Sequence, residues 1–165
     1  MSFRVYLPAA AAAAAVAIAI PVAASSQGGP QTINLTEHNK GSTFNYIDNP
    51  PRNPNKKRPV FSPGDEFVFT NPVTDSAGAR DGELRAKCTT LRKAPASDRG
   101  FNKSHPICAG ALVLRDGTIF LNVAEGSNNV SGAVAGGTGA YANARGTFQS
   151  TNTKSGSNDV VTLEP

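Results

Sequence analysis

Short stretches in which apolar and polar residues alternate follow one another along the chain, and this is the period of a β-strand with one buried face. No stretch keeps a helical period over two turns. Clusters of Gly, Pro, Asn, Asp and Ser separate the stretches and mark turns. The pattern predicts eight strands, at residues 32–37, 66–71, 84–89, 107–114, 118–124, 131–135, 146–152 and 159–163.

Short strands joined mainly by tight turns predict one antiparallel sheet whose edges must be protected. Closure into a barrel removes the edges, and eight strands enclose room for packed side chains or one small ligand. We therefore expect an all-β fold, a closed eight-stranded antiparallel β-barrel, with an open β-sandwich as the alternative. Residues 38–63 form a long, polar, proline-rich segment. Most of it should cross the barrel mouth or rim, although part could pair as a short strand.

The first 24 residues have the pattern of a secretory signal peptide. Arg4 supplies a positive charge, and residues 5–22 form an almost unbroken apolar run rich in alanine. We expect cleavage after Ala24, which leaves residues 25–165 as the single barrel domain of a secreted, extracellular protein. A retained membrane anchor is the alternative, because about 18 apolar residues can span a bilayer, but two prolines interrupt this run.

The formal charge of +4 is modest, and much of the basic excess lies at residues 52–58, without interleaved aromatic side chains. Nucleic-acid binding needs a broader basic face, so we interpret this segment as a solvated loop and expect no nucleic-acid partner. No segment after the leader is apolar enough for a stable membrane span.

Cys88 and Cys108 are the two cysteines of the chain. Export would place them in an oxidising compartment, where an even pair normally forms a disulfide. Each lies in a predicted strand, and a hairpin about the loop at Asp98 brings them face to face. Two cysteines alone make no zinc site, and we expect neither a metal nor a cofactor. His38 and His105 lie in polar loops, and we interpret them as solvated rather than as metal ligands.

Two polar side chains fall on predicted apolar faces. Glu37 is in phase with the aliphatic residues of its strand, and Asn71 is in phase with Phe67 and Phe69. An acid in such a place must be paired, protonated or functional. The alternative is that Glu37, near a strand end, reaches solvent or bonds an arginine such as Arg145. The sequence holds no serine–histidine–aspartate set and no zinc-protease motif.

Residues 130–148 form a glycine-rich corner between two predicted strands. Its three closely set glycines permit a sharp fold over the end of the sheet, which places Tyr141 and Arg145 there. The segment is no phosphate loop, because no Lys-Ser/Thr pair and no long helix follow it. We interpret it mainly as a structural corner, with direct ligand contact as the alternative.

Several short motifs stand in a recognisable order: Glu-x-x-x-Gly-Ser at 37–42, Gly-Asp at 64–65, Phe-Thr-Asn at 69–71, the strand cysteine Cys88, and Gly-Gly-Thr-Gly-x-Tyr-x-x-Ala-Arg-Gly at 136–146. This order resembles the allene oxide cyclase and dirigent superfamily over nearly the whole mature chain, and the last motif is the most specific. Secreted bacterial proteins of the allene oxide cyclase barrel-like type are the most similar, since they also carry a signal peptide and a cysteine pair.

The resemblance implies an eight-stranded barrel whose lumen binds an apolar small molecule, commonly in a homodimer or homotrimer. In the cyclase branch, a lumen glutamate and an asparagine holding a water assist epoxide opening and steer ring closure, and the matching positions are Glu37 and Asn71. Thr43 stands where plant cyclases have a proline, and Cys88 matches a cavity cysteine that a disulfide would remove from chemistry. In the dirigent branch the barrel performs no oxidation and only orients reactive intermediates.

The sequence therefore predicts a secreted barrel that binds an apolar small molecule and guides its cyclisation or coupling, as an isomerase-like enzyme or a stereo-directing protein. Glu37 would stabilise positive charge or take a proton, and Asn71 would hold a water or a substrate oxygen. A non-enzymatic carrier and a secreted structural barrel are the alternatives. The other candidate ligand-binding side chains are Phe67, Phe69, Tyr141 and Arg145.

Overall fold

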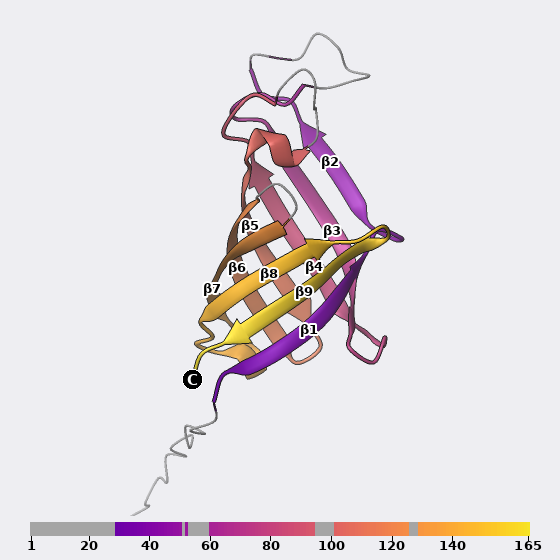
Figure 1. The fold of residues 1–165 in the computed structure, drawn as a ribbon, viewed down its shortest axis with the longest axis vertical. Helices are drawn as coiled ribbons and strands as arrows, with labels where there is room; N and C mark the ends of the chain where they lie inside the picture. Colours follow the sequence, from indigo (N-terminus) through magenta and orange to yellow (C-terminus); the bar gives the residue numbers. More distant parts are fainter. Residues whose placement is uncertain (1–28, 51, 53–59, 95–100, 126–128) are drawn as a thin grey trace, which may run out of the picture.

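The computed structural model of the chain describes residues 29–50, 52, 60–94, 101–125 and 129–165. The predicted signal peptide, most of the basic segment 52–58 and the loop at Asp98 lie outside the described residues. The strands are β1 (Gln31–His38), β2 (Thr43–Ile47), β3 (Glu66–Asp75), β4 (Arg80–Thr89), β5 (Ile107–Leu114), β6 (Gly117–Glu125), β7 (Asn129–Gly137), β8 (Gly146–Asn152) and β9 (Gly156–Leu163) (Figure 1). Two short 3₁₀ helices are η1 (Phe101–Ser104) and η2 (Gly139–Tyr141).

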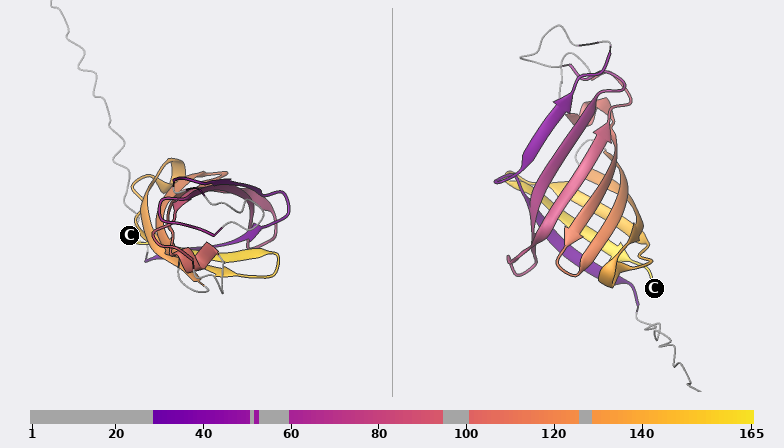
Figure 2. Two further views of the ribbon diagram at one scale, coloured as in Figure 1. Left: turned by 90° about the horizontal axis from the view of Figure 1, so that it is seen from above. Right: turned by 180° about the vertical axis from the view of Figure 1, so that it is seen from behind.

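All neighbouring strands pair antiparallel in the order β1-β9-β8-β7-β6-β5-β4-β3-β2, and a further pairing of β1 with β3 closes the sheet. Viewed from above, the strands form a ring (Figure 2). The predicted closed eight-stranded barrel is therefore confirmed, and the β-sandwich alternative is wrong. Among the described residues, no helix is long and apolar enough to cross a membrane.

The strand β2 is the addition to the predicted eight. It shares the edge of β3 with β1: residues 43–47 pair with residues 66–70, and residues 35–37 pair with residues 73–75. This double pairing explains why β3 runs four residues beyond its predicted end at Asn71. Pro72 lies between the two paired segments, where a missing backbone N–H costs the ladder little.

A buried carboxylate, Asp65, fixes the loop that leads from β2 into β3. It accepts hydrogen bonds from the Tyr46 hydroxyl at 2.7 Å, the Ser62 backbone N–H at 2.8 Å and the Asn49 backbone N–H at 3.1 Å. Burial, followed by the hydrogen bond to Asp65, raises the pKa of Tyr46. Tyr46 and Phe61 then pack against Phe67, which is fully buried, so β2 is held to the barrel by both polar and aromatic contacts.

The inward-facing side chains of the eight barrel strands form the main hydrophobic core. The register places most of them in the half of the barrel next to the β5–β6 turn and the glycine corner. This half of the barrel is filled by packed side chains, whereas the other half contains a cavity. The buried members are Leu35, Val73, Leu84, Leu112, Leu114, Ile119, Leu121, Val134, Phe148, Val161 and Leu163.

Cys88 and Cys108 lie directly opposite each other on β4 and β5 and form a disulfide. The predicted pairing is confirmed, and both side chains point into the barrel, where they pack against Phe67. The cross-link joins the two strands close to the start of β5.

Candidate functional site

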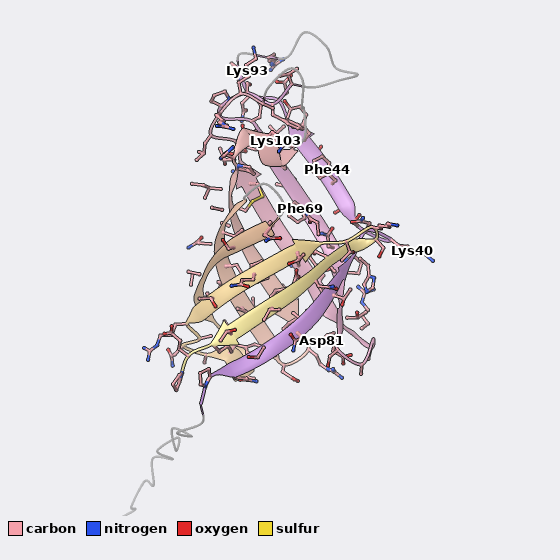
Figure 3. All side chains as sticks on the ribbon, viewed as in Figure 1. Lys40, Phe44, Phe69, Asp81, Lys93 and Lys103 are labelled. Carbon is pink, nitrogen blue, oxygen red and sulfur yellow. A yellow bond between two sulfur atoms is a disulfide. The ribbon has the colours of Figure 1, made fainter. Side chains whose placement is uncertain are left out.

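The half of the barrel opposite the glycine corner encloses a cavity of about 160 Å³. Its lining comes from the ends of the strands that converge there, which include the end of β1, the start of β9 and the start of β5. Phe69 and the disulfide lie in this part of the barrel (Figure 3). The cavity is therefore a feature of the lumen, as the sequence predicted.

The cavity has two chemically different sides. Strands β4 to β7 contribute only apolar groups: Leu84, Ala86, the disulfide, Gly110, Leu121, Val123 and Val130. The polar lining comes from β1, β3, β8 and β9 and from the residues beside them, and we call this set the polar wall: Glu37, Asn39, Asn71, Ser150, Asn152 and Ser157. A ligand in the cavity would thus meet one apolar and one hydrogen-bonding side.

Glu37 and Asn71 meet at the centre of the polar wall. Glu37 is only 6% exposed, and its Oε2 accepts a 2.6 Å hydrogen bond from Asn71 Nδ2. The pair forms because the β1–β3 closure sets Glu37 opposite Val73, one inward-facing position from Asn71. A buried carboxylate held by an amide is a fixed negative group facing an apolar space, and such a group can stabilise positive charge on a ligand.

A second buried carboxyl group, Asp159 on β9, lies beneath Glu37 and was not among the predicted site residues. It is 1% exposed, and neither of its oxygens makes a hydrogen bond of ordinary geometry with the described residues. Burial first, then the charge and contact of Glu37, raise the pKa of Asp159 to about 8, while the nearby Ser150 and Ser157 hydroxyls lower it. Burial beside Glu37 therefore favours the protonated form of the Asp159 carboxyl.

The sequence did carry a signal for Asp159. It alternates with Val161 and Leu163, the same pattern that identified Glu37 and Asn71. The predicted strand began at Asp159, which made the residue a strand end, but β9 begins at Gly156 and places Asp159 in the interior of the strand, opposite Ser150.

The two predicted phenylalanines have different surroundings. Phe69 lines the cavity beside the Glu37–Asn71 pair. Phe67 is 0% exposed and does not line the cavity, because Tyr46, Phe61 and the disulfide enclose it. Phe67 thus packs against the disulfide, which is part of the cavity lining.

Tyr141 and Arg145 lie at the opposite end of the barrel from Glu37. Gly139 has a φ of +62°, which favours glycine, and the tight turn that it makes sets Tyr141 against the main core. Arg145 donates a 2.9 Å hydrogen bond to the Pro165 carbonyl and lies 3.8 Å from the Glu164 carboxylate. The alternative in which Arg145 pairs with Glu37 is therefore wrong.

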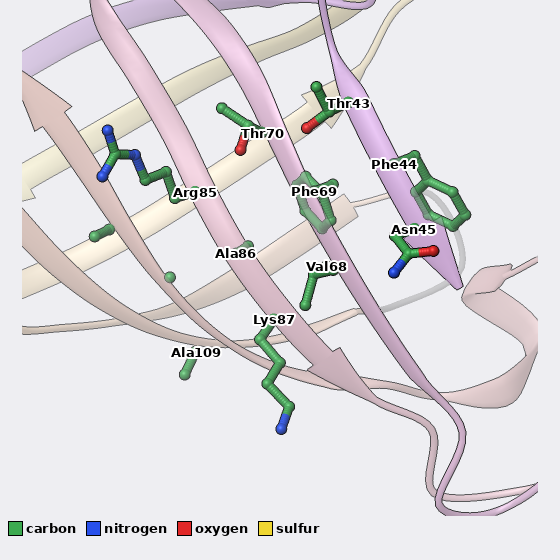
Figure 4. A pocket seen from close by; sticks show the side chains of 12 residues that line it. Thr43, Phe44, Asn45, Val68, Phe69, Thr70, Arg85, Ala86, Lys87 and Ala109 are labelled. Carbon is green, nitrogen blue, oxygen red and sulfur yellow. The ribbon is translucent and has the colours of Figure 1, made fainter. Parts of the chain in front are cut away.

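A larger hollow of about 560 Å³ lies on the outside of the barrel, across β2 to β5 (Figure 4). Its floor is formed by short side chains such as Ala109 and Ala111. Its two cations are already paired, Arg85 with Glu83 at 2.5 Å and Lys87 with Glu66 at 2.8 Å. This shallow groove offers no buried polar group, and we place the site in the lumen instead.

The described residues contain no group of three or more His, Cys, Asp or Glu side chains arranged to hold a metal ion. His38 Nε2 lies 3.0 Å from the Thr74 hydroxyl, on the outer side of the β1–β3 junction. The polar side chains that line the cavity carry carboxyl, amide and hydroxyl groups.

No protein-family model matches the sequence, and no curated protein is similar to it in sequence. Solved structures do share the fold. A pyocyanin demethylase matches with a TM-score of 0.59 at 18% identity, over 81% of this chain and 98% of that chain. The exo-specific intermolecular Diels-Alderase AbnU matches with a TM-score of 0.57 at 14% identity, over 84% and 100%. The pterocarpan synthase dirigent protein GePTS1 matches with a TM-score of 0.54 at 15% identity, over 82% and 84%.

At these identities the similarity establishes the fold, and it extends over most of both chains in each comparison. The chain has the barrel fold of dirigent and allene oxide cyclase-like proteins, so the predicted resemblance is confirmed at that level.

Proposed function

We propose that the protein binds a small molecule in its lumen, with an apolar ring against strands β4 to β7, and guides its cyclisation or coupling. The observation that carries this proposal is the buried Glu37–Asn71 pair, which faces a cavity inside a closed barrel. A buried acid that faces a cavity is a candidate functional group, because its desolvation is costly and has to be compensated.

The size of the cavity limits what it can take. An apolar cavity of about 150 Å³ holds one benzene-sized molecule. The lumen, at about 160 Å³, therefore has room for one ring and its substituents, and a larger ligand would extend toward the mouth. This volume favours a ligand whose reacting part is a single ring or a chain folded to that size.

The chemistry that fits the site is charge stabilisation in a fixed conformer. Glu37 would stabilise positive charge that develops during epoxide opening or ring closure, and Asn71 would keep the carboxylate in place while its remaining amide groups orient a water or a substrate oxygen. Phe69 would close the cavity beside the reacting centre. Few catalytic groups are needed, since the barrel itself sets the conformation.

The comparisons support this proposal by analogy of fold. AbnU is described as a Diels-Alderase, a catalyst of ring formation, and GePTS1 as a dirigent protein. The same barrel also serves a pyocyanin demethylase, so the fold does not fix one reaction.

A non-enzymatic carrier is the second candidate. The small number of polar groups in the cavity suits simple retention of an apolar ligand, and a carrier would bind probes reversibly without product. A purely structural barrel is less well supported, because Glu37 is buried beside a cavity instead of facing solvent.

Racemic styrene oxide tests the proposal, since it carries one ring and develops positive charge at the benzylic carbon as the epoxide opens. We expect the protein to accelerate hydrolysis to the diol, in which a water oxygen bonds to the benzylic carbon as its C–O bond breaks and a proton from that water ends on the freed epoxide oxygen. One enantiomer of the remaining epoxide should be enriched, as followed by chiral chromatography. Glu37→Gln should reduce the rate by at least about tenfold, because one preorganised charge-stabilising group is lost.

The matched control is Glu66→Gln, which removes an outward-facing carboxylate paired with Lys87 and should leave the rate unchanged. Opening at the uncatalysed rate without enantiomeric bias, together with reversible binding of the epoxide, would favour the carrier. A rate that survives Glu37→Gln would remove Glu37 from the chemistry.

Export belongs to the same proposal. We infer that residues 1–24 direct secretion and are removed after Ala24, and the disulfide supports an oxidising destination. Self-association as a homodimer or homotrimer, implied by the resemblance, is included in the proposal. Intact and native mass spectra of the exported protein would report the new N-terminus and the number of chains together.

A further inference from the structure

The cavity lining carries an acidic side chain and no basic one among the described residues. Among the described residues that line it, Glu37 is the one ionisable side chain, and none is a lysine, arginine or histidine. The Asn71 amide donates to Glu37 but brings no positive charge. The lumen thus places a carboxylate against an apolar space without a cation to balance it.

Asp159 is a second buried acid, and it lies next to Glu37. It is almost completely buried and points inward between Ser157 and Val161, and the described residues donate no hydrogen bond of ordinary geometry to either of its oxygens. The groups that face it are Glu37 from β1, Ser150 from β8 and Ser157 from β9, and none of them is cationic. Two buried acids with so few donors form an environment that a positive group would satisfy.

A shared proton satisfies the pair only in part. One proton between two carboxyl groups leaves one negative charge in a poorly hydrated space. A ligand cation placed against Glu37 would compensate that charge, while its ring would occupy the apolar side formed by β4 to β7.

We propose that the lumen selects ring-sized ligands bearing a positively charged or protonatable nitrogen, and that this nitrogen lies against Glu37, whose neighbour Asp159 is buried behind the cavity lining. This inference rests on the proposed function, because it requires that the lumen bind a small molecule. The inference goes beyond the proposed function by naming the chemical class of the ligand, which is an aromatic or alicyclic amine or a cationic nitrogen heterocycle.

Binding of such a ligand would release a proton. Burial and Glu37 hold the Asp159 proton at neutral pH, and a nearby ammonium group favours the ionised carboxylate instead. When the cation docks, the Asp159 O–H bond breaks and its proton passes to the solvent. Benzylamine binding near pH 7 should therefore release up to one proton per ligand.

Four probes of nearly equal size test the inference: benzylamine, benzyl alcohol, toluene and benzoate, titrated into the purified protein by calorimetry at pH 7. We expect benzylamine, which is cationic at this pH, to bind at least about tenfold more tightly than benzyl alcohol or toluene, and benzoate to bind most weakly. Repeating the benzylamine titration in buffers of different ionisation enthalpy counts the protons released.

Two variants locate the selectivity. Glu37→Gln should weaken benzylamine binding by about tenfold and change toluene binding by less than about twofold, because only the charged probe loses a partner. Asp159→Asn should abolish proton release, since an amide has no proton to lose in this range. The wild-type probe order is informative on its own if either variant fails to fold.

The outcomes separate the two proposals. If toluene or benzoate binds as tightly as benzylamine, the inference about the cation is overturned while lumen binding stands. If no probe binds, lumen binding itself fails and the inference falls with it. Tight benzylamine binding that survives Glu37→Gln would also overturn the inference, because the cation would then lie elsewhere.

Discussion

Three inward-facing residues, Glu37, Asn71 and Asp159, determine the character of the lumen. Each is a polar residue at an inward-facing strand position, where the alternation of apolar and polar residues predicts an apolar side chain. Two of them could be predicted from the sequence, because their strands were recognised with the correct phase. The contact between Glu37 and Asp159 could not, because it depends on the register of β1 against β9, which sets Glu37 opposite Ser157 and next to Asp159.

The raised pKa of Asp159 predicts that the stability of the protein depends on pH. The pKa of Asp159 rises from an ordinary value of 3.8 to about 8 on folding, so the native state keeps a proton that the unfolded chain loses between these values. Stability should therefore fall as pH rises from about 4 to about 8. Asp159→Asn cannot titrate and should unfold at higher urea than the wild type at pH 8, but at similar urea at pH 4.

Urea unfolding followed by circular dichroism at several pH values checks this prediction. Glu164→Gln, at an exposed carboxylate beside the C-terminus, is the control and should parallel the wild type. Parallel curves for Asp159→Asn and the wild type across the whole range would show that the Asp159 carboxyl is not held protonated.

The Glu37–Asn71 hydrogen bond makes a prediction of its own. Asn71→Leu leaves the buried Glu37 carboxylate without its donor and should cost about 1–3 kcal/mol of unfolding free energy. The double variant Glu37→Leu/Asn71→Leu removes both partners and should recover much of that loss, because an apolar pair needs no hydrogen bond. A double-mutant cycle in urea measures the coupling, and additive effects would contradict a direct interaction.

At the scale of strands and turns, the alternation of apolar and polar residues was sufficient to predict the bounds of a strand where a tight turn followed it. β5 and β8 coincide with their predicted ranges. β2 was not assigned because its five residues lie within a proline-rich segment and share the edge of β3 with β1, a long-range pairing that local pattern does not encode. In the glycine corner, Tyr141 packs against the main core and Arg145 donates a hydrogen bond to the Pro165 carbonyl, and neither residue lines the cavity.

The disulfide joins β4 to β5 within the lining of the cavity and should stabilise this part of the barrel. It closes a loop with a sequence separation of 20 residues. For a loop of about 20 residues, loss of the cross-link costs about 3 kcal/mol, largely through the entropy of the unfolded chain. The double variant Cys88→Ser/Cys108→Ser should therefore melt about 10 °C lower than the wild type, as measured by calorimetry.

Intact-mass measurement before and after reduction is the companion test, and it should show a single bond in the exported protein. Two free thiols there would contradict the assignment. An unchanged melting temperature in the double variant would mean that the cross-link does not stabilise the barrel.

At the scale of the whole molecule, the barrel divides into a packed half and a hollow half. The sequence predicted closure from the number of short strands, but the volume of the lumen depends on how eight inward-facing rows fit together, which the sequence alone does not specify. The apolar side from β4 to β7 and the acidic polar wall follow from this assembly. Together they distinguish a barrel with room for a ligand from one that is filled by its own side chains.

The most direct test of lumen binding is a methyl NMR titration with toluene, a neutral probe that is independent of the proposed charge selectivity. Leucine and valine methyl groups report both surfaces of the barrel. Shifts should concentrate on the inward-facing set and be absent from the outward-facing set, the inward residues being Leu84, Leu121, Val123 and Val130 and the outward ones Val68, Val113 and Val160. Shifts confined to the outward set, or none in either set at saturating toluene, would contradict binding inside the barrel.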